Sequence, residues 1–168
     1  MRTTTSRVTA VDPVDYLCGA WDVDRAVLDL GTGGRGAFRG TARGVVVAAG
    51  VLSFEEEGEM TVNGHRGPAR RTFELVRTAS GRADVRFADG RHFHSLELGP
   101  APFAVEHRCG ADSYRGEFQL HGSERWSSVW EVCGPAKRYR LATSYARRAG
   151  LPEGGLRVGG PVPRALRW

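Results

Sequence analysis

The stretch FAVEHRCGADSYRGEFQL, from Phe103 to Leu120, decides the fold because it contains two alternating runs joined by a turn. In both halves apolar residues alternate with polar ones, which is the period of a β-strand with one buried face. Gly110, Ala111 and Asp112 separate the halves with residue types that are typical of turns. The stretch therefore predicts a β-hairpin with one face against a core.

The same alternation repeats along the chain, and no sustained helical period accompanies it. Between the runs lie turn signals, of which Asn63-Gly64 and Asp89-Gly90 are the strongest, because these residues tolerate a positive φ. Before the first run, Asp12 to Cys18 predicts a short helix with Asp12 as N-cap and Pro13 at the first helical position. The predicted strands cover residues 20–29, 36–47, 50–57, 68–77, 82–88, 91–98, 103–109, 112–121, 125–133 and 137–147.

Many antiparallel strands with short connections must protect their edges, and closure into a barrel does this most completely. We therefore predict an all-β fold, a single up-and-down antiparallel barrel of about ten strands with a short N-terminal helix. A two-sheet sandwich is the alternative. A barrel of roughly eight to ten strands has room for one small ligand. The expected organisation is an N-terminal arm at 1–13, the barrel domain at 14–148 and a Gly/Pro-rich tail at 149–168.

Composition narrows the classes of partner. The chain of 168 residues has a formal net charge of +5, but its arginines are scattered among Asp and Glu, so nucleic-acid binding is not expected. No apolar run approaches the ~20 residues of a membrane helix, and the N-terminus lacks a secretory apolar core. Three cysteines without a CxxC pair fit a reducing cytoplasm rather than a disulfide framework. Oligomeric state is not specified.

Ionisable residues converge at the top of the predicted barrel if the strands run strictly up and down and the helix lies at the bottom. Alternate side chains share a face. On that face several strands are apolar toward the bottom and ionisable toward the top, which is typical of a ligand pocket. One β-bulge in a strand would exchange its faces. The expected mouth contains Glu56, Arg71, His92, His94, His107, Cys109, Asp112, Tyr114 and Lys137.

Lys137 is the only lysine beside 23 arginines. Lysine carries a compact ammonium whose pKa shifts readily, whereas guanidinium stays charged. The position is therefore a candidate for a titratable amine, a Schiff-base former or an anion anchor. A composition bias toward arginine explains a single lysine equally simply.

The candidate catalytic residues are His94, His107, Asp112, Tyr114 and Lys137. The two histidines suit a general acid and base, although both are also explained as hydrogen-bonded barrel residues. Asp112 would orient a histidine, pair with Lys137, or simply close an Asx turn. Tyr114 and Lys137 would stabilise a developing enolate or oxyanion.

A second set of residues is expected to bind the substrate, and each has a structural alternative. Glu56 and Arg71 also suit a cross-strand ion pair. Cys109 is a candidate thiolate or a small buried apolar residue. The tryptophans fill the core or line the pocket. The expected substrate-binding residues are Glu56, Arg71, Arg91, Cys109, Trp130 and Tyr139.

Three phrases carry a resemblance to a family: FADGRHFH (87–94), HRCGADSYRG (107–116) and GPAKRY (134–139). They resemble an uncharacterised family, common in actinomycetes, with the signature GRxFH, HxCxxDxY and GPxKxY over residues 14–147. The resemblance implies a calycin-like barrel, related in shape to lipocalins and nitrobindins, without an established activity. The family often has an acidic residue where Arg138 stands. The signature positions are Arg91, His94, His107, Cys109, Asp112, Tyr114, Lys137 and Tyr139.

These observations predict a barrel that encloses one small organic ligand and performs acid–base chemistry on it. A cyclase, isomerase or dehydratase of bacterial specialised metabolism fits, by analogy of fold only, and no cofactor or metal is expected. One alternative is a non-catalytic carrier or sensor of a ligand or haem. The other is a metal-dependent enzyme that uses His94, His107 and an acidic ligand, although no known ligand spacing is matched.

Overall fold

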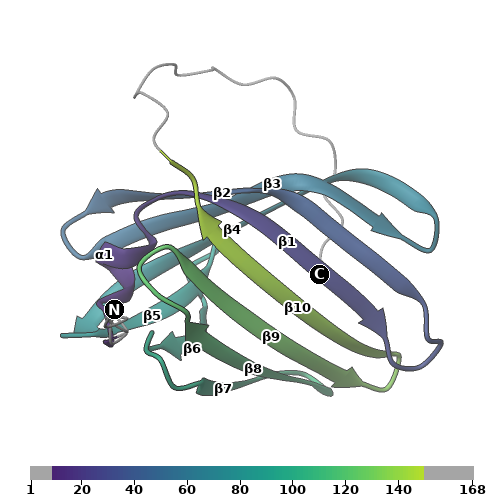
Figure 1. Cartoon of the computed structure of the whole chain (residues 1–168). Coiled ribbons are helices and arrows are strands. Elements are labelled where there is room, and N and C mark those ends of the chain that lie inside the picture. The colour runs from purple at the N-terminus through teal and green to yellow at the C-terminus, as the bar shows by residue number, and fades with distance from the viewer. Residues whose placement is uncertain (1–8, 150–168) are drawn as a thin grey trace, which may run out of the picture.

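The computed structural model describes residues 9–149 as one antiparallel sheet that curls into a nearly closed barrel (Figure 1). The predicted all-β, up-and-down barrel with a short N-terminal helix is confirmed. Each of the ten predicted strands corresponds to an observed one, whereas most of the predicted arm and tail lies outside the described residues. The elements are α1 (Pro13–Leu17), β1 (Gly19–Asp29), β2 (Arg35–Ala48), β3 (Val51–Val62), β4 (His65–Ala79), β5 (Arg82–Phe87), β6 (His92–Leu96), β7 (Phe103–Cys109), β8 (Asp112–Leu120), β9 (Arg125–Gly134) and β10 (Lys137–Arg147).

Closure of the barrel joins the first and last strands. The spatial order is β6-β5-β4-β3-β2-β1-β10-β9-β8-β7, and β1 pairs with β10 from Trp21 opposite Arg147 to Asp29 opposite Tyr139. The two ends of this order, β6 and β7, share no hydrogen-bonded ladder in the described part of the chain. We call the line between them the seam. The barrel is therefore closed by backbone hydrogen bonds everywhere except at the seam.

The hairpin between β3 and β4 is longer than predicted. Both strands continue to the Asn63-Gly64 turn, where φ is 51° at Asn63 and 78° at Gly64. Positive φ at both central residues suits a two-residue hairpin turn, as this dipeptide predicted. Pairing extends to Val62 opposite His65, because the tight turn leaves no loop residues outside the strands.

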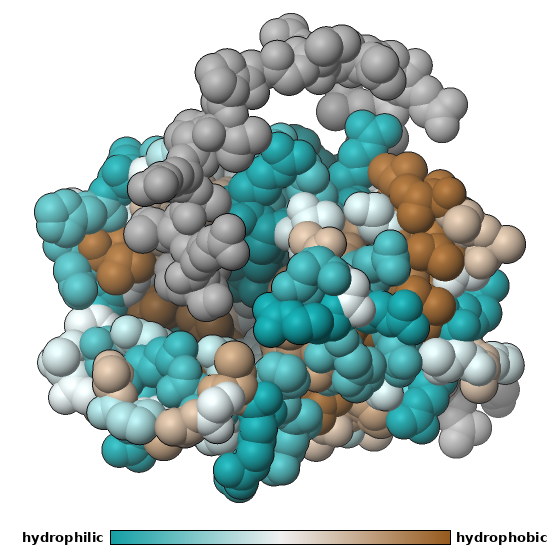
Figure 2. All heavy atoms as spheres, turned by 180° about the vertical axis from the view of Figure 1, so that it is seen from behind, coloured by the Kyte–Doolittle hydropathy of each residue, from teal (hydrophilic) through white to brown (hydrophobic). Residues whose placement is uncertain are grey.

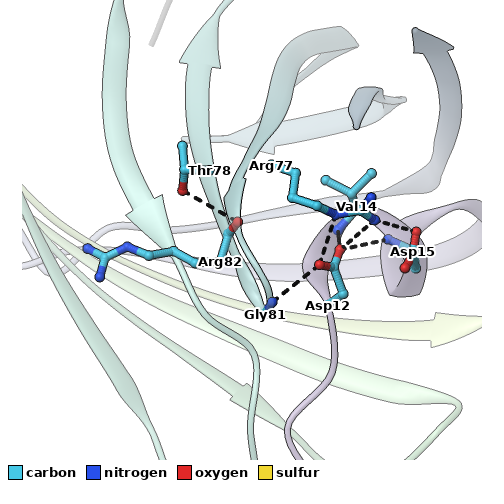
Figure 3. A network of polar contacts seen from close by, with 7 residues as sticks. All are labelled: Asp12, Val14, Asp15, Arg77, Thr78, Gly81 and Arg82. Atoms are coloured by element: carbon cyan, nitrogen blue, oxygen red, sulfur yellow. Dashed lines mark hydrogen bonds and ion pairs between the residues drawn. The ribbon is translucent and has the colours of Figure 1, made fainter. Parts of the chain in front are cut away.

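The helix α1 closes the lower end of the barrel and is capped as predicted. Asp12 Oδ1 accepts hydrogen bonds from the backbone N–H groups of Val14 (3.0 Å) and Asp15 (3.3 Å). Its other oxygen accepts from Arg77 Nε (2.9 Å) and from the Gly81 N–H (3.3 Å), which ties the cap to the β4–β5 hairpin (Figure 3). Most of α1 is buried. The lower end is therefore a packed floor, and the polar groups described below lie above it.

Aromatic rings fill the lower barrel. Trp21 is fully buried and meets Trp126 edge-on, with ring centroids 6.3 Å apart. Trp126 in turn stacks on Tyr145 with centroids 3.7 Å apart and an angle of 2° between the planes. Leucines of neighbouring strands surround these rings: Leu52, Leu75, Leu96 and Leu120. The predicted apolar floor is therefore present.

A β-bulge between β5 and β6 decides which histidine enters the barrel. Val85 pairs with His94 but the next residue, Arg86, pairs with His92, so Phe93 is the extra residue. His92 lies outside, 55 % exposed, with Nε2 3.6 Å from Asp84 Oδ1. The expectation that His92 joins His94 in the mouth is wrong, because the bulge exchanges the faces of the strand.

The outer face is mostly hydrophilic, and apolar residues gather at the upper right of the view in Figure 2. Three consecutive valines at the end of β2, Val45 to Val47, are exposed. Arginines pair with acidic residues of neighbouring strands across this face: Arg66 with Glu59, Arg70 with Glu55, Arg115 with Glu106 and Arg140 with Glu131. Within residues 9–149 no helix has the length and apolar character needed to cross a membrane.

Candidate functional site

The structure divides the predicted mouth into two polar groups at different heights. We call the group around Glu56 the inner network and the group around Lys137 the outer cluster. Strands β8 and β9 give their order: Phe118 pairs with Ser128, then Gly116 with Trp130, then Tyr114 with Val132. Ser128 belongs to the inner level and Tyr114 to the outer one. Trp130 therefore stands between the two groups.

The inner network is centred on Glu56, which is 2 % exposed. Arg71 donates to both of its oxygens, from Nε to Oε2 (2.7 Å) and from Nη2 to Oε1 (3.1 Å). Arg25 Nη2 donates to Oε2 (2.8 Å), and the Tyr145 hydroxyl donates to Oε1 (2.5 Å). Arg25 also donates from Nε to the Thr143 hydroxyl (2.8 Å). The predicted Glu56–Arg71 cross-strand ion pair is confirmed as part of a larger buried network.

Sequence reasoning missed Arg25 and Tyr145. A signal for Arg25 existed, because it continues the alternation of Trp21 and Val23 in β1 and so lies on their buried face. An arginine among buried apolar positions indicates a buried partner, since a guanidinium is rarely buried alone. The same alternation places Tyr145 on the inner face of β10 with Leu141 and Thr143, but it does not identify Glu56, 89 residues away in the sequence, as its partner.

The charges of the inner network are fixed by its own contacts. Burial raises the pKa of Glu56, but the guanidinium groups of Arg71 and Arg25 outweigh burial and lower it to about 2. Burial raises the pKa of Tyr145 to about 12, so its hydroxyl keeps the proton that it donates. Two guanidinium groups and one carboxylate give a net charge of +1 (2 − 1).

A cavity of about 50 Å³ adjoins the inner network. Apolar side chains such as Leu75, Val85 and Phe118 form most of its wall. Trp126 also lines the cavity. Among the described residues, its Nε1 is the one buried side-chain nitrogen or oxygen atom that has no hydrogen-bond partner. An unpaired buried N–H in a residue that lines a cavity is a candidate donor to an acceptor atom of a ligand. The polar residues of the wall are Glu56, Arg71, His94, Ser128 and Tyr145.

His94 brings a neutral imidazole to this cavity. It is 4 % exposed, and its Nδ1 lies 2.8 Å from the carbonyl oxygen of Ser95. Because a carbonyl oxygen can only accept, Nδ1 carries the proton and Nε2 is left with a free lone pair. Burial lowers the pKa of His94 to about 4, although the Ser95 carbonyl opposes this. At neutral pH His94 is therefore an uncharged base.

Aromatic rings separate the cavity from the outer cluster. Phe93 stacks on Trp130, with centroids 5.1 Å apart and planes 10° apart, and on Phe87 at 4.6 Å. The ring of His107 meets Phe93 edge-on at 4.9 Å. We call Phe87, Phe93, His107 and Trp130 the aromatic layer. Since Phe93 lies on β6 and His107 on β7, the layer joins the two sides of the seam.

Gly116 makes room for this layer. A Cβ atom at Gly116 would lie 2.9 Å from three atoms of the Trp130 ring, closer than carbon atoms pack. Any other residue at 116 would therefore push the indole off β8. Glycine at this position lets Trp130 cross its neighbouring strand and reach Phe93.

The outer cluster is an ion pair with a hydroxyl group. Lys137 Nζ lies 2.8 Å from Asp112 Oδ2 and donates a hydrogen bond to the Tyr114 hydroxyl (3.2 Å). Asp112 packs over Gly134, where a Cβ atom would collide with its carboxylate. The hydrogen bonds to Asp112 and Tyr114 raise the pKa of Lys137 above its ordinary value. The Lys137 side chain is therefore a charged ammonium group, held by Asp112 and Tyr114, rather than a neutral amine. It is 31 % exposed.

The remaining predicted residues lie farther from the cavity. Arg91 is exposed, with Nε 2.8 Å from Asp89 Oδ2 in the β5–β6 turn. Cys109 is exposed at the end of β7. Tyr139 is half-buried opposite Val132. The structure thus brings Glu56, Arg71 and His94 to one cavity, and it groups Asp112, Tyr114 and Lys137 elsewhere.

The side chains present and the size of the cavity can be compared with what a metal ion or a haem requires. Among residues 9–149 no group of three or more His, Cys, Asp or Glu side chains is arranged to hold a metal ion. A haem is a flat macrocycle much larger than a cavity of about 50 Å³, and the residues that line this cavity do not fit it.

Residues 17–147 match a family of unknown function, DUF6314, and the chain belongs to that family. The comparison with curated proteins gave no match. The family assignment agrees with the sequence resemblance in one respect, since both describe a family without a known activity.

Two solved structures share the barrel fold. The S-type phycobiliprotein lyase CPES of Guillardia theta superposes with a TM-score of 0.59 at 8 % identity, over 82 % of this chain and 92 % of that one. A protein of unknown function from the DUF3598 family of Nostoc punctiforme gives 0.57 at 9 % identity, over 84 % of this chain. The match covers 51 % of that second protein, so the chain spans about half its length. At these identities the similarity concerns the fold alone.

Proposed function

We propose that this protein binds one small organic molecule in the cavity beside His94 and performs acid–base chemistry on it without a cofactor. The observation that carries the proposal is His94 itself. It is a buried imidazole with Nδ1 committed to Ser95, so that Nε2 is the free basic atom of a residue that lines the cavity. An apolar wall with few polar groups is typical of small-molecule sites.

The simplest reaction for this arrangement is proton transfer next to a carbonyl group. His94 Nε2 takes a proton from a carbon atom of the ligand, the C–H bond breaks, and its electron pair forms an enolate whose negative charge lies on oxygen. Arg71 lines the same cavity, and its guanidinium group would stabilise that oxygen. Return of the proton from the imidazolium to another atom gives an isomer. A subsequent loss of water or ring closure corresponds to a dehydratase or cyclase.

The outer cluster takes a supporting role in this proposal. Asp112 holds Lys137 rather than a histidine, and Tyr114 and Lys137 would contact the polar end of a ligand that extends past the aromatic layer. His107 in the aromatic layer would be the second proton carrier. Glu56, Arg71 and Trp130 are the best supported of the substrate-binding candidates, because they line or adjoin the cavity. Arg91, Cys109 and Tyr139 stay proposals with less support.

A non-catalytic carrier is the second candidate. One observation favours it: the pKa of His94 is lowered to about 4, whereas a general base works best with a pKa near the working pH. In a carrier, the same Nε2 would accept a hydrogen bond from the ligand.

The proposed setting is the cytoplasm of a bacterium, in specialised metabolism. All three cysteines are free, which suits a reducing compartment. The metabolic setting rests on the family resemblance and on analogy of fold. No nucleic-acid partner is proposed, because arginines of the outer face pair with acidic residues.

Deuterium exchange tests the proposed chemistry. The protein is incubated in D₂O with a panel of small ketones and keto acids, and mass spectrometry measures deuterium at the carbon beside the carbonyl group. We expect exchange with the wild-type protein and with the control His92→Gln, because His92 lies outside the barrel, and no exchange with His94→Gln. Equal exchange by His94→Gln would remove His94 as the base. Thermal stabilisation by a compound that never exchanges would favour the carrier.

A further inference from the structure

We infer that the group bound in the cavity is a carboxylate, held by Arg71 and the Trp126 indole N–H. The inference rests on the proposed function in one respect, namely that the cavity beside His94 takes a small molecule. It adds the chemical class of that molecule and the residues that select it.

The first argument is charge. Arg25 and Arg71 face a single carboxylate, Glu56, so the inner network carries one more positive than negative charge. The other polar groups packed around it are uncharged hydroxyl groups and the neutral His94. An excess charge inside a protein is unfavourable unless a counter-charge or water stabilises it. The excess is accessible, since Arg71 lines the cavity and its side chain is 26 % exposed. An anion in the cavity would supply the counter-charge.

The second argument is the balance of donors and acceptors. Each oxygen of Glu56 already accepts two hydrogen bonds, so Glu56 has no free acceptor capacity for a ligand. Donors are in excess. Trp126 Nε1 has no partner in the described part of the chain. A ligand group that only accepts hydrogen bonds, as a carboxylate does, fits this excess.

The third argument is size. A cavity of about 150 Å³ lined by apolar residues takes benzene, and this cavity has about 50 Å³. A carboxylate with a short alkyl group therefore suits it, with the oxygens toward Arg71 and the alkyl group against Leu75, Val85 and Leu96. The same chemistry is offered by a free short-chain acid and by the carboxylate end of a longer molecule.

The probes are propionate and propionamide, which have nearly the same shape and differ in charge. Both are titrated into the full chain at matched ionic strength, because salt screens charges. NMR follows the indole N–H resonance of Trp126 and the methyl resonances of Leu75 and Val85, which line the cavity and are kept in every variant. We expect propionate to bind at least about tenfold more tightly than propionamide, which is about 1.4 kcal/mol. Comparing the affinities of hexanoate and propionate shows whether the site takes the carboxylate end of a longer molecule or a short-chain acid.

Variants at three positions make the test specific. Trp126→Phe keeps the aromatic ring but removes the N–H, and we expect it to weaken propionate severalfold without weakening propionamide. Arg71→Gln removes the positive charge beside the cavity. Arg71→Lys keeps that charge and is the variant to measure if Arg71→Gln does not fold. Arg66→Gln removes an arginine of the same strand that pairs with Glu59 outside the barrel, and it should leave both affinities unchanged.

The possible failures are distinguishable. Equal or tighter binding of propionamide would overturn the carboxylate inference while leaving the cavity as a ligand site. Propionate binding that is unchanged in both Trp126→Phe and Arg71→Lys would overturn the assignment of these two residues. If neither probe nor any neutral compound of this size shifts a cavity resonance, the proposed function fails together with the inference.

Discussion

Trp130 of β9 stacks on Phe93 of β6 with ring planes 10° apart, although β8, β7 and the seam lie between these strands around the barrel. The pair spans the seam, where the backbone forms no ladder in the described structure. Side-chain packing thus replaces hydrogen bonds at the one break in the barrel. Both rings also pack against His94, which lines the cavity, so the seam and the candidate site share these rings.

Gly116→Ala tests the packing of the aromatic layer. The new Cβ would lie 2.9 Å from the Trp130 ring, so we expect a loss of about 1–3 kcal/mol in the free energy of unfolding. Urea denaturation measures it. The control is Gly67→Ala, where a Cβ meets nothing within 4 Å, and its effect should stay within about 0.5 kcal/mol. Equal effects of the two substitutions would show that Gly116 is not required for packing.

Glu56→Gln tests the buried network. The substitution leaves Arg25 and Arg71 without their common counter-charge, so we expect a loss of about 3–5 kcal/mol in stability. The matched control is Glu55→Gln on the outer face, whose exposed pair with Arg70 contributes about 1 kcal/mol or less. Denaturant unfolding of both proteins gives the comparison. A Glu56→Gln protein as stable as the control would mean that water stabilises the charges of Arg25 and Arg71 without Glu56.

The pH dependence of stability reports on His94. Its pKa is near 6.5 in the unfolded chain and is lowered to about 4 in the folded protein, so the unfolded state binds the proton more readily. The contribution to stability is complete above pH 6.5 and is lost as the pH falls toward 4, by up to about 3 kcal/mol. His94→Gln should remove this slope. Unfolding free energies measured across that range would contradict the assignment if the variant kept the wild-type slope.

Lys137 is its own reporter, because it is the only lysine in the chain. Hydrogen bonds to Asp112 and Tyr114 raise its pKa, so its side-chain NMR signal should not titrate below about pH 10.5. Asp112→Asn should lower the midpoint. A midpoint near neutral pH in the wild-type protein would instead restore Lys137 as a candidate base or Schiff-base former.

Asp12→Ala tests the floor of the barrel. It removes the N-cap of α1 together with the hydrogen bonds from Arg77 and Gly81, and we expect a loss of about 1–2 kcal/mol. Asp24→Ala is the control, because Asp24 has only a loose contact with Arg39 at 3.9 Å on the outer face. Both are compared by urea denaturation. A loss no larger than that of the control would mean that α1 is held by its buried side chains alone.

The sequence by itself determined the fold. Period-two alternation and turn residues gave ten strands within a few residues of their observed bounds, and Asp12-Pro13 gave the start of the helix. These features are local, because the alternation of side chains and the φ preferences of Asn-Gly act within a few residues. The same alternation correctly assigned Glu56, Arg71 and His94 to the inner face.

The tertiary structure alone decided how those residues are grouped. One bulge at Phe93 moved His92 outside, and no local signal in β6 announced it. The inner network joins Arg25, Glu56 and Tyr145 across the barrel, and Trp130 divides it from Lys137. Contacts across a barrel depend on the register and tilt of strands that are far apart in sequence. The sequence therefore determined which side chains face inward, and only closure of the barrel decided which of them meet.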